Sequence, residues 1–228
     1  YAVTDDKGAS ANGSFSITLT GTNDAPTATY TTNLSALEGA SSISGQLTSS
    51  DVDASGAPSF FLSDASGNTQ DASGNSFSID GLTLNTDGSF SFDPSNSSYN
   101  SLKDGQSQSL TINYVAKDDQ GLNSNVQSFD INVLGTNDAP TATYTTADVV
   151  DASGSALAPL EGGASVSGQL TSSDVDASGN PTYSLVGSSI PGLTLSSDGS
   201  WTFDPTNSAY NQLQGGQTQT IDVDYAVT

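Results

Sequence analysis

The sequence predicts an all-β protein built from tandem Greek-key β-sandwich domains in an end-to-end array. Three features support this fold class: a long internal repeat, short segments in which apolar and polar residues alternate, and clusters of Gly, Asn, Asp and Ser between those segments. The segment GTNDAPTATY occurs identically at Gly21–Tyr30 and Gly135–Tyr144, a spacing of 114 residues (135 − 21). A joint between repeated domains explains why this segment is unchanged while the residues between its copies vary in sequence and length.

The repeat extends well beyond this segment. SGQLTSSDVDASG recurs at Ser44–Gly56 and Ser167–Gly179, and FDPSNSSYNSL at Phe92–Leu102 matches FDPTNSAYNQL at Phe203–Leu213. The spacing therefore changes from 114 to 123 (167 − 44) and then to 111 (203 − 92). A nine-residue insertion around Asp148–Pro159 and a later twelve-residue deletion account for these changes, and both fall between the motifs, as surface loops permit.

Alternation of apolar and polar residues predicts the individual strands. In SFSITLT (Ser14–Thr20) every second residue is apolar, and FDINV (Phe129–Val133) has the same pattern. Leu110–Tyr114 and Ile221–Tyr225 alternate in the same way, which is typical of antiparallel strands with one face in a core. No segment has a convincing helical period. About seven strands in roughly 110 residues indicate a sandwich of the immunoglobulin or cadherin kind.

The joint also sets the expected domain boundaries. We predict that residues 1–23 are the last strands of a preceding repeat, 24–134 the first sandwich, 135–138 the linker and 139–228 the second sandwich. The second sandwich ends at Tyr225–Thr228, which matches residues 114–117 of the first, so it is expected to lack its final strand.

The N-terminus carries the kind of segment that the second sandwich lacks. A sandwich without one strand exposes apolar side chains and unpaired backbone groups, which favours strand addition. We therefore expect residues 1–20 either to complete the second sandwich of another copy, head to tail, or to belong to a window on a longer repeat array. Packing of Phe15, Ile17 and Leu19 on the core of their own first sandwich would contradict both.

Composition limits the partners and the chemistry. Asp and Glu number 25 against three Lys and Arg, and the net charge of −22 disfavours nucleic acid and anionic membranes as partners and favours cations. The chain has no His or Cys, which excludes a Ser–His or Cys–His catalytic pair, a disulfide and a zinc site of the usual kind. No apolar stretch approaches the ~20 residues of a membrane helix. No signal peptide is evident, and the first residues are expected to come from the middle of a longer protein.

The acidic residues recur in four places that match between the repeats: Asp-Asp-x-Gly, Asn-Asp in the joint, Leu-Glu-Gly, and Asp-x-Asp. The two Leu-Glu-Gly motifs contain the only glutamates of the chain. Calcium takes about six to eight oxygens from carboxylates, amides and backbone carbonyls, so the set predicts Ca²⁺ at the joints. Any one Asp, Asn or Gly is also an ordinary turn residue, and acidic surfaces keep secreted proteins soluble. The recurrence of the whole set is what favours a metal.

These motifs resemble VCBS-type, cadherin-like tandem repeats. The resemblance rests on GTNDAP, the Glu-Gly turn, SGQLT followed by Asp-Val-Asp, and L-x-L-x-x-D-G-S-W/F-x-F, and it covers nearly the whole chain in two copies. It implies a giant bacterial surface protein, typically an RTX-type adhesin secreted by type I export, in which Ca²⁺ at the joints stiffens a stalk. The linker also resembles the cadherin linker Asp-x-Asn-Asp-Asn without its first and last positions. The glycine-rich RTX nonapeptides are absent from this chain.

The resemblance further implies metal ligands at each joint. At the complete joint they are Asp118, Asp119, Asn137, Asp138, Glu161, Asp174 and Asp176. At the first joint the matching residues are Asp5, Asp6, Asn23, Asp24, Glu38, Asp51 and Asp53. Asn137 is expected to contribute its backbone or amide oxygen.

The leading functional hypothesis is a structural extender: a stalk repeat of a secreted bacterial cell-surface adhesin or filament. Its partners would be neighbouring repeats and other copies of the chain; no adhesive ligand is indicated. The alternative is a carbohydrate- or surface-binding module, for which Phe60 and Phe61 are candidates, whereas Trp201 aligns with Phe90 and is expected in the core. An enzyme is not expected, because the carboxylates fall at the domain ends and no other catalytic base is present.

Overall fold

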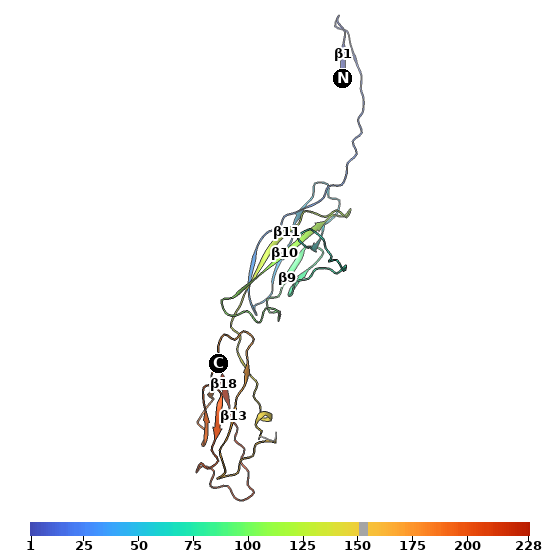
Figure 1. Cartoon of the computed structure of the whole chain (residues 1–228). Helices are drawn as coiled ribbons and strands as arrows, with labels where there is room; N and C mark the ends of the chain where they lie inside the picture. The colour runs from blue at the N-terminus through green and yellow to red at the C-terminus, as the bar shows by residue number, and fades with distance from the viewer. Residues whose placement is uncertain (151–154) are drawn as a thin grey trace.

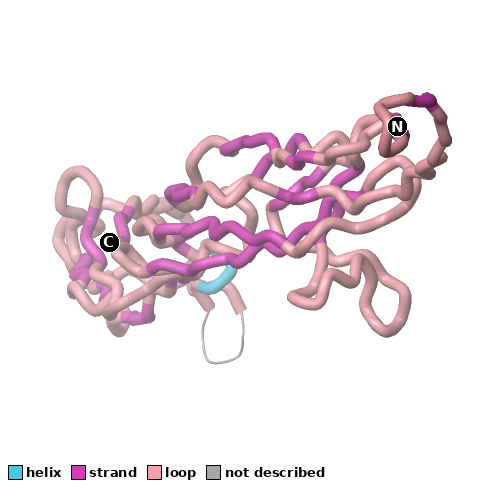
Figure 2. Tube along the Cα trace, turned by 90° about the horizontal axis from the view of Figure 1, so that it is seen from above, coloured by secondary structure: helices cyan, strands magenta, loops and turns pink. Residues whose placement is uncertain are grey.

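The computed structural model describes residues 1–150 and 155–228. Two β-sandwiches follow one another end to end, and an extended N-terminal segment leads away from them (Figure 1). We call residues 27–134 the N-terminal sandwich and residues 141–227 the C-terminal sandwich. In a view turned by 90°, strands alternate with long loops, and the short turn η1 (Thr146–Asp148) is the one helical element of the described residues (Figure 2). The predicted all-β sandwich fold is confirmed.

The N-terminal sandwich contains a four-stranded sheet in the order β4–β11–β10–β7 and a three-stranded sheet in the order β5–β9–β8, with the short pair β3–β6 beside them. The bounds are β3 Thr27–Ala28, β4 Leu34–Leu37, β5 Ile43–Gln46, β6 Ser49–Ser50, β7 Ser59–Leu62, β8 Leu82–Leu84, β9 Ser89–Phe92, β10 Ser107–Lys117 and β11 Gln127–Leu134. All pairs are antiparallel except β4 with β11, which run parallel.

The core forms because β10 and β11 send every second side chain inward. Phe129, Ile131 and Val133 of β11 are at most 3% exposed. The ring of Phe129 packs against Phe90 of the facing sheet, with centroids 5.2 Å apart. The buried Tyr114 hydroxyl accepts a hydrogen bond from the backbone N–H of Tyr30 at 2.8 Å, so its polar end is satisfied. The predicted alternation in these two strands therefore corresponds to one buried face.

The C-terminal sandwich repeats most of this arrangement. Its strands are β12 Thr141–Ala142, β13 Val166–Gln169, β14 Ser172–Ser173, β15 Tyr183–Leu185, β16 Leu193–Leu195, β17 Ser200–Phe203 and β18 Tyr225–Val227. The sheets β13–β17–β16, β12–β14 and β15–β18 match β5–β9–β8, β3–β6 and β7–β10. Among the described residues, none is the counterpart of β11 here, and residues 157–160 and 218–224 on either side of its place form no strand. Part of the predicted insertion around Asp148–Pro159 lies outside the described residues.

The N-terminal segment packs on neither sandwich. β1 (Ala2–Thr4) and β2 (Ser10–Asn12) form an antiparallel hairpin, and the chain then runs without regular structure to β3. Phe15, Ile17 and Leu19 are 74%, 82% and 92% exposed. These three side chains therefore do not pack on the core of the first sandwich, the result that would have contradicted both expectations for residues 1–20. Within the two described ranges there is no helix long and apolar enough to cross a bilayer.

Candidate metal sites at the ends of the sandwiches

A short strand pair brings an Asn-Asp motif beside an Asp-x-Asp motif in the N-terminal sandwich. β3 pairs with β6 in the register Thr27↔Ser50, and three more residues along each strand place Asp24 opposite Asp53. The backbone N–H of Asp24 donates to Asp53 Oδ2 at 3.2 Å, which shows that the two motifs do face each other.

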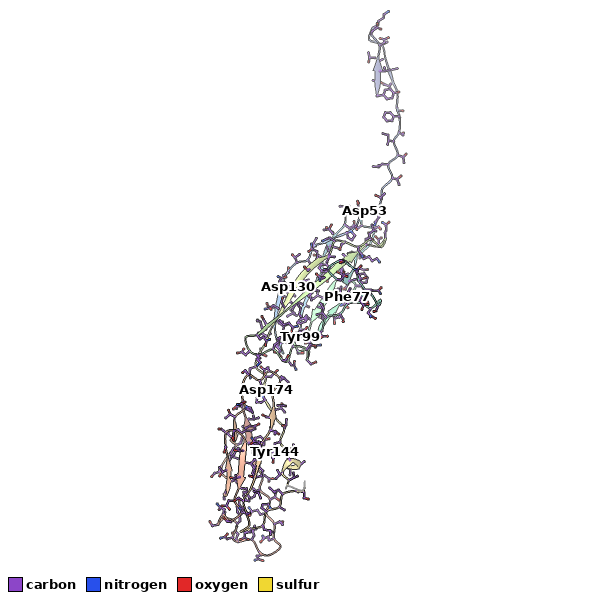
Figure 3. The ribbon with its side chains drawn as sticks, viewed as in Figure 1. Asp53, Phe77, Tyr99, Asp130, Tyr144 and Asp174 are labelled. Atoms are coloured by element: carbon purple, nitrogen blue, oxygen red, sulfur yellow. The ribbon has the colours of Figure 1, made fainter. Side chains whose placement is uncertain are left out.

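The same end of this sandwich receives the Asp-Asp turn that follows β10. The Asn23 side-chain amide donates to Asp118 Oδ2 at 2.7 Å, and the Ser55 hydroxyl donates to Asp119 Oδ2 at 2.5 Å. Asp53 lies at this end, beside the point where the N-terminal segment leaves the sandwich (Figure 3). We call these residues the N-terminal cluster: Asn23, Asp24, Asp51, Asp53, Asp118 and Asp119.

The carboxyls of the N-terminal cluster influence one another. The hydrogen bond from the Asn23 amide holds the pKa of Asp118 below its ordinary value of 3.8, although partial desolvation opposes it. Asp51 behaves in the opposite way. The backbone N–H of Asp53 by itself lowers the pKa of Asp51, but desolvation and the neighbouring Asp53 and Asp118 carboxylates raise that pKa overall. A bound cation would relieve the repulsion that raises it.

The parallel pair β4–β11 places Glu38 at the joint between the sandwiches. Leu37 lies beside Leu134 at the end of both strands, so Glu38 follows β4 where the linker follows β11. The Glu38 backbone N–H donates to Leu134 O at 2.8 Å, and the Thr136 backbone N–H donates to Glu38 Oε2 at 3.2 Å. Glu38 is only 6% exposed, which is unusual for a carboxylate.

Asp138 and Asp176 meet at the same joint. β12 pairs with β14 in the register Thr141↔Ser173, and three further residues along each strand set Asp138 opposite Asp176. Asp174, two residues before Asp176, lies where the C-terminal sandwich meets its neighbour (Figure 3). We call this set the joint cluster: Glu38, Asn137, Asp138, Asp174 and Asp176.

Three carboxylate oxygens of the joint cluster are buried without a hydrogen-bond donor: Glu38 Oε1, Asp138 Oδ2 and Asp176 Oδ1. Asp176 as a whole is only 5% exposed. Burial of an unpaired carboxylate oxygen is strongly unfavourable unless a cation or a donor satisfies it. These oxygens therefore fit a cation.

The structure corrects the grouping expected from the sequence. Asp118 and Asp119 do not join Asn137, because β11 runs from the Asp-Asp turn at one end of the sandwich to the linker at the other, over about 27 Å for its eight residues. Glu161 does not join the joint cluster either. The neighbouring Gly162 bonds to Pro205 O at the far end of the C-terminal sandwich, as Gly39 bonds to Pro94 O beside Glu38.

The remaining expected ligands are likewise redistributed. Asp5 and Asp6 lie in the turn of the β1–β2 hairpin, where Asp5 Oδ1 accepts the backbone N–H groups of Lys7 and Ala9 at 2.9 and 2.8 Å. Glu38 was expected with the N-terminal cluster and lies at the opposite end of its sandwich. Sequence reasoning missed the contributions of Ser55 and of the Thr136 N–H; the position of Ser55 two residues after Asp-x-Asp, in both repeats, was the available signal.

Taken alone, neither cluster is a preformed cage of acidic side chains. Across residues 1–150 and 155–228, no three or more acidic side chains are grouped closely enough to hold a metal ion by themselves. A cation at the joint would therefore also need amide and backbone oxygens, and Asn137 offers both kinds.

Comparisons with known proteins find distant similarity to solved structures and no match elsewhere. No protein-family model matches the chain, and no curated protein matches it. Similar solved structures include human Protocadherin-24 EC1-2 (15% identity, covering 83% of this chain and 81% of that chain, TM-score 0.40). Others are Drosophila N-cadherin EC1-4 (14%, 83% and 43%, 0.39) and mouse Cadherin-23 EC22-24 (16%, 78% and 53%, 0.38). The chain thus spans about half of the last two structures. Identities and TM-scores this low carry no conclusion about ligand or function.

Proposed function

We propose that the chain is a structural extender, in which sandwich repeats are joined end to end and a cation held at each joint stiffens the array. The three buried carboxylate oxygens of the joint cluster that lack a donor carry this proposal. They come from the end of β4, from the linker and from the loop after β14. A cation held by carboxylate oxygens of this set together with amide and backbone oxygens of the linker would connect the two sandwiches.

Matched residues of the two repeats support a role specific to the joint. Glu38 is buried where the linker follows β11, whereas its counterpart Glu161 is exposed. Asp176 is buried at the joint, whereas its counterpart Asp53 is exposed at the free end of the N-terminal sandwich. At each of the two matched positions, the carboxylate is therefore buried only in the copy that lies where the two sandwiches meet.

Calcium is the cation that best suits these groups. Carboxylate, amide and backbone oxygens are hard ligands, and Ca²⁺ accepts irregular arrangements of about six to eight of them. Asn137 lies between Thr136 and Asp138, and its side-chain amide now donates to Asp138 O at 2.8 Å. Its amide oxygen is therefore close to the cluster and available as a ligand.

The wider setting of the extender follows from the motifs that resemble VCBS-type repeats. We propose a secreted bacterial cell-surface adhesin or filament of the RTX type as the parent protein. The low Lys and Arg content and the net charge of −22 suit a protein exposed to calcium-containing medium.

The binding-module alternative gains no support from Phe60 or Trp201, and Phe61 is half-buried in β7. Phe60 is 5% exposed and packs near Tyr114, with ring centroids 6.3 Å apart. Trp201 lies across Gly168, where a Cβ atom would sit 2.5 Å from the indole ring, as Phe90 lies across Gly45. These rings belong to the packing of the sheets rather than to an exposed platform.

Small-angle X-ray scattering with and without Ca²⁺ tests the proposal. Chelation should broaden the distribution of angles between the sandwiches and change the maximum dimension, because the joint loses its cross-link. Ca²⁺ should also raise the free energy of unfolding, by about 2.7 kcal/mol at a free concentration one hundred times the Kd. An unchanged scattering profile in calcium and in chelator would refute the stiffened joint.

Variants at matched positions distinguish calcium binding at the joint from a general effect of calcium on the acidic chain. Glu38→Gln and Asp176→Asn should each reduce the calcium response. Glu161→Gln removes the same charge from the exposed counterpart and should leave that response unchanged in the monomer. Equal losses in Glu38→Gln and Glu161→Gln would mean that calcium acts on the overall charge and not at the joint.

A further inference from the structure

We propose that residues 30–38, which we call the clamp segment, form a mechanical clamp that keeps the N-terminal sandwich folded when the chain is pulled along its length. The inference deepens the extender function and rests on it for one point, the direction of the load. It does not depend on a cation, because the contacts that form the clamp are hydrogen bonds within the chain.

Tension along the chain enters and leaves the N-terminal sandwich at opposite ends. Residues 21–26 lead into β3 at the end farthest from the joint, and the linker that follows β11 leaves at the joint (Figure 1). Force therefore pulls β4 through its first residue, Leu34, away from the joint. It pulls β11 through its last residue, Leu134, toward the joint.

The parallel pairing of β4 with β11 places this load in shear. Leu34 lies beside Ile131 and Leu37 beside Leu134, and the hydrogen bonds of a parallel pair are evenly spaced along it. Because the two strands are pulled in opposite directions along their own length, all of these bonds are strained at the same time. Strands that separate from one end would instead lose their bonds one after another, at a lower force. The pairing of β4 with β11 therefore resists tension.

Side chains extend the row of hydrogen bonds beyond both ends of β4. Asn33, which precedes β4, accepts the backbone N–H of Asp130 on its side-chain Oδ1 at 2.8 Å. Glu38, which follows β4, donates its backbone N–H to Leu134 O at 2.8 Å and accepts the Thr136 N–H on Oε2 at 3.2 Å. The bonds that must break together thus extend past the strand pair in both directions.

A buried tyrosine fastens the start of the clamp segment to β10. The hydroxyl of Tyr114 accepts the backbone N–H of Tyr30 at 2.8 Å and donates to the backbone oxygen of the same residue at 3.0 Å. Two hydrogen bonds to one backbone residue oppose its sliding along the strand. In the C-terminal sandwich the matched hydroxyl, that of Tyr225, donates to Tyr144 O at 3.1 Å. Both sandwiches therefore have this fastening.

The strand before the clamp segment is held over a shorter length. β3 pairs with β6 over two residues, Thr27 and Ala28. We expect β3 to detach first under load, because fewer residues hold it than hold the clamp segment. The load then reaches Tyr30 and β4, and the sandwich remains folded for as long as β4 stays paired with β11.

Single-molecule force spectroscopy of the 228-residue chain, held by attachment domains fused to both ends, tests the proposal. The measured quantity is the unfolding rate of the N-terminal sandwich at constant force in chelator. Unfolding of residues 27–134 should release about 330 Å of chain and unfolding of residues 141–227 about 260 Å, so the step length identifies the sandwich that unfolds. The N-terminal sandwich should unfold in one step.

Tyr114→Phe removes both hydrogen bonds to Tyr30. The unfolding rate of the N-terminal sandwich under load should rise at least about fivefold, the factor that corresponds to the lower end of the cost of leaving a buried polar group unsatisfied. The equilibrium stability, measured by denaturant titration without load, should fall as well.

Tyr99→Phe is the matched control. Tyr99 is 1% exposed, against 0% for Tyr114, and its hydroxyl donates to Asp80 O at 2.6 Å. This contact joins the segments before β8 and after β9, outside the path of the load. Tyr99→Phe should lower the equilibrium stability but leave the unfolding rate under load unchanged, since its contact is still formed when the clamp breaks.

A second pair of variants, at exposed positions, keeps the test valid if the first variant does not fold. Asn33→Ala removes the bond to the Asp130 N–H and should raise the unfolding rate under load at least about twofold, as expected for the net loss of one hydrogen bond. Asn85→Ala removes the bond from the Asn85 amide to Ser89 Oγ at 3.0 Å, in the turn between β8 and β9, and should leave that rate unchanged.

Two results would overturn the clamp. One is an equal rise of the unfolding rate in Tyr114→Phe and Tyr99→Phe, or in the two asparagine variants, because the sandwich would then yield as a whole. The other is a wild-type N-terminal sandwich that releases its length in several steps, because its strands would then separate one after another.

The same measurements in Ca²⁺ separate the clamp from the proposed calcium joint. If the clamp variants behave as expected in chelator and Ca²⁺ alters neither the unfolding rates nor the scattering profile, the calcium joint is refuted and the clamp stands. If Ca²⁺ lowers the unfolding rate but the clamp variants do not change it, the clamp is refuted and the calcium joint stands.

Discussion

At the scale of single residues, the two repeats provide internal controls. Glu38 and Glu161 have the same neighbours in sequence, Leu before and Gly after, yet only Glu38 is buried. The difference arises because the linker that follows β11 covers Glu38 and donates the Thr136 N–H to it. The burial of this glutamate thus depends on whether a linker covers the end of the sandwich that carries it.

Gly135 gives a prediction at this scale. Gly135→Ala should lower the free energy of unfolding of the N-terminal sandwich by about 1–3 kcal/mol, because the new Cβ would lie 2.4 Å from a backbone oxygen and the turn at Lys103 must shift. Denaturant titration measures the loss. Gly21→Ala adds the same methyl group in open space and should have little effect in the monomer; an equal loss there would contradict the packing explanation.

At the scale of secondary-structure elements, β11 is the strand on which the sandwich depends. It pairs with β10 and β4 and buries three large apolar side chains. In the C-terminal sandwich, where the described residues include no counterpart of β11, the flanking segments are not strands. Pairing on both sides is what holds β4 and the first half of β10 in extended, hydrogen-bonded form.

Truncating the centre of this strand tests its importance. Ile131→Ala should destabilise the N-terminal sandwich by about 2–5 kcal/mol, since a fully buried side chain leaves a cavity. The circular dichroism transition of this sandwich should shift, while the fluorescence of Trp201, the only tryptophan, should report an unchanged C-terminal sandwich. Ile17→Ala in dilute solution is the control and should shift neither transition, because Ile17 is exposed there.

At the scale of the whole molecule, charge opposes association. Each copy carries a net charge of −22 and only three cationic side chains, so salt bridges cannot hold copies together. Any association of copies must overcome repulsion between like-charged chains, which is screened over about 10 Å at 0.1 M salt.

Much of the fold could be predicted because it depends on local patterns. Alternation marked β10 and β11, whereas residues 14–20 and 221–224, which alternate in the same way, form no strand. The repeated motifs aligned the strands of one sandwich with those of the other. The grouping of acidic residues could not be predicted, because it depends on which end of the sandwich each strand reaches. The parallel pairing of β4 with β11 carries Glu38 to the end opposite Asn23, and no local pattern reveals it.

Composition and periodicity are properties read along the chain, and they were sufficient to predict the all-β class, the two-fold repeat, the recurring acidic set and the apolar alternation at Ser14–Thr20. That Glu38, Asp138 and Asp176 lie at the joint, that Asp118 lies at the opposite end, and that Ile17 packs on neither sandwich follow from the folded arrangement. Strand direction and pairing bring distant residues together; burial then makes an unpaired carboxylate oxygen unfavourable, as exposure makes a row of apolar side chains unfavourable, until a partner covers it.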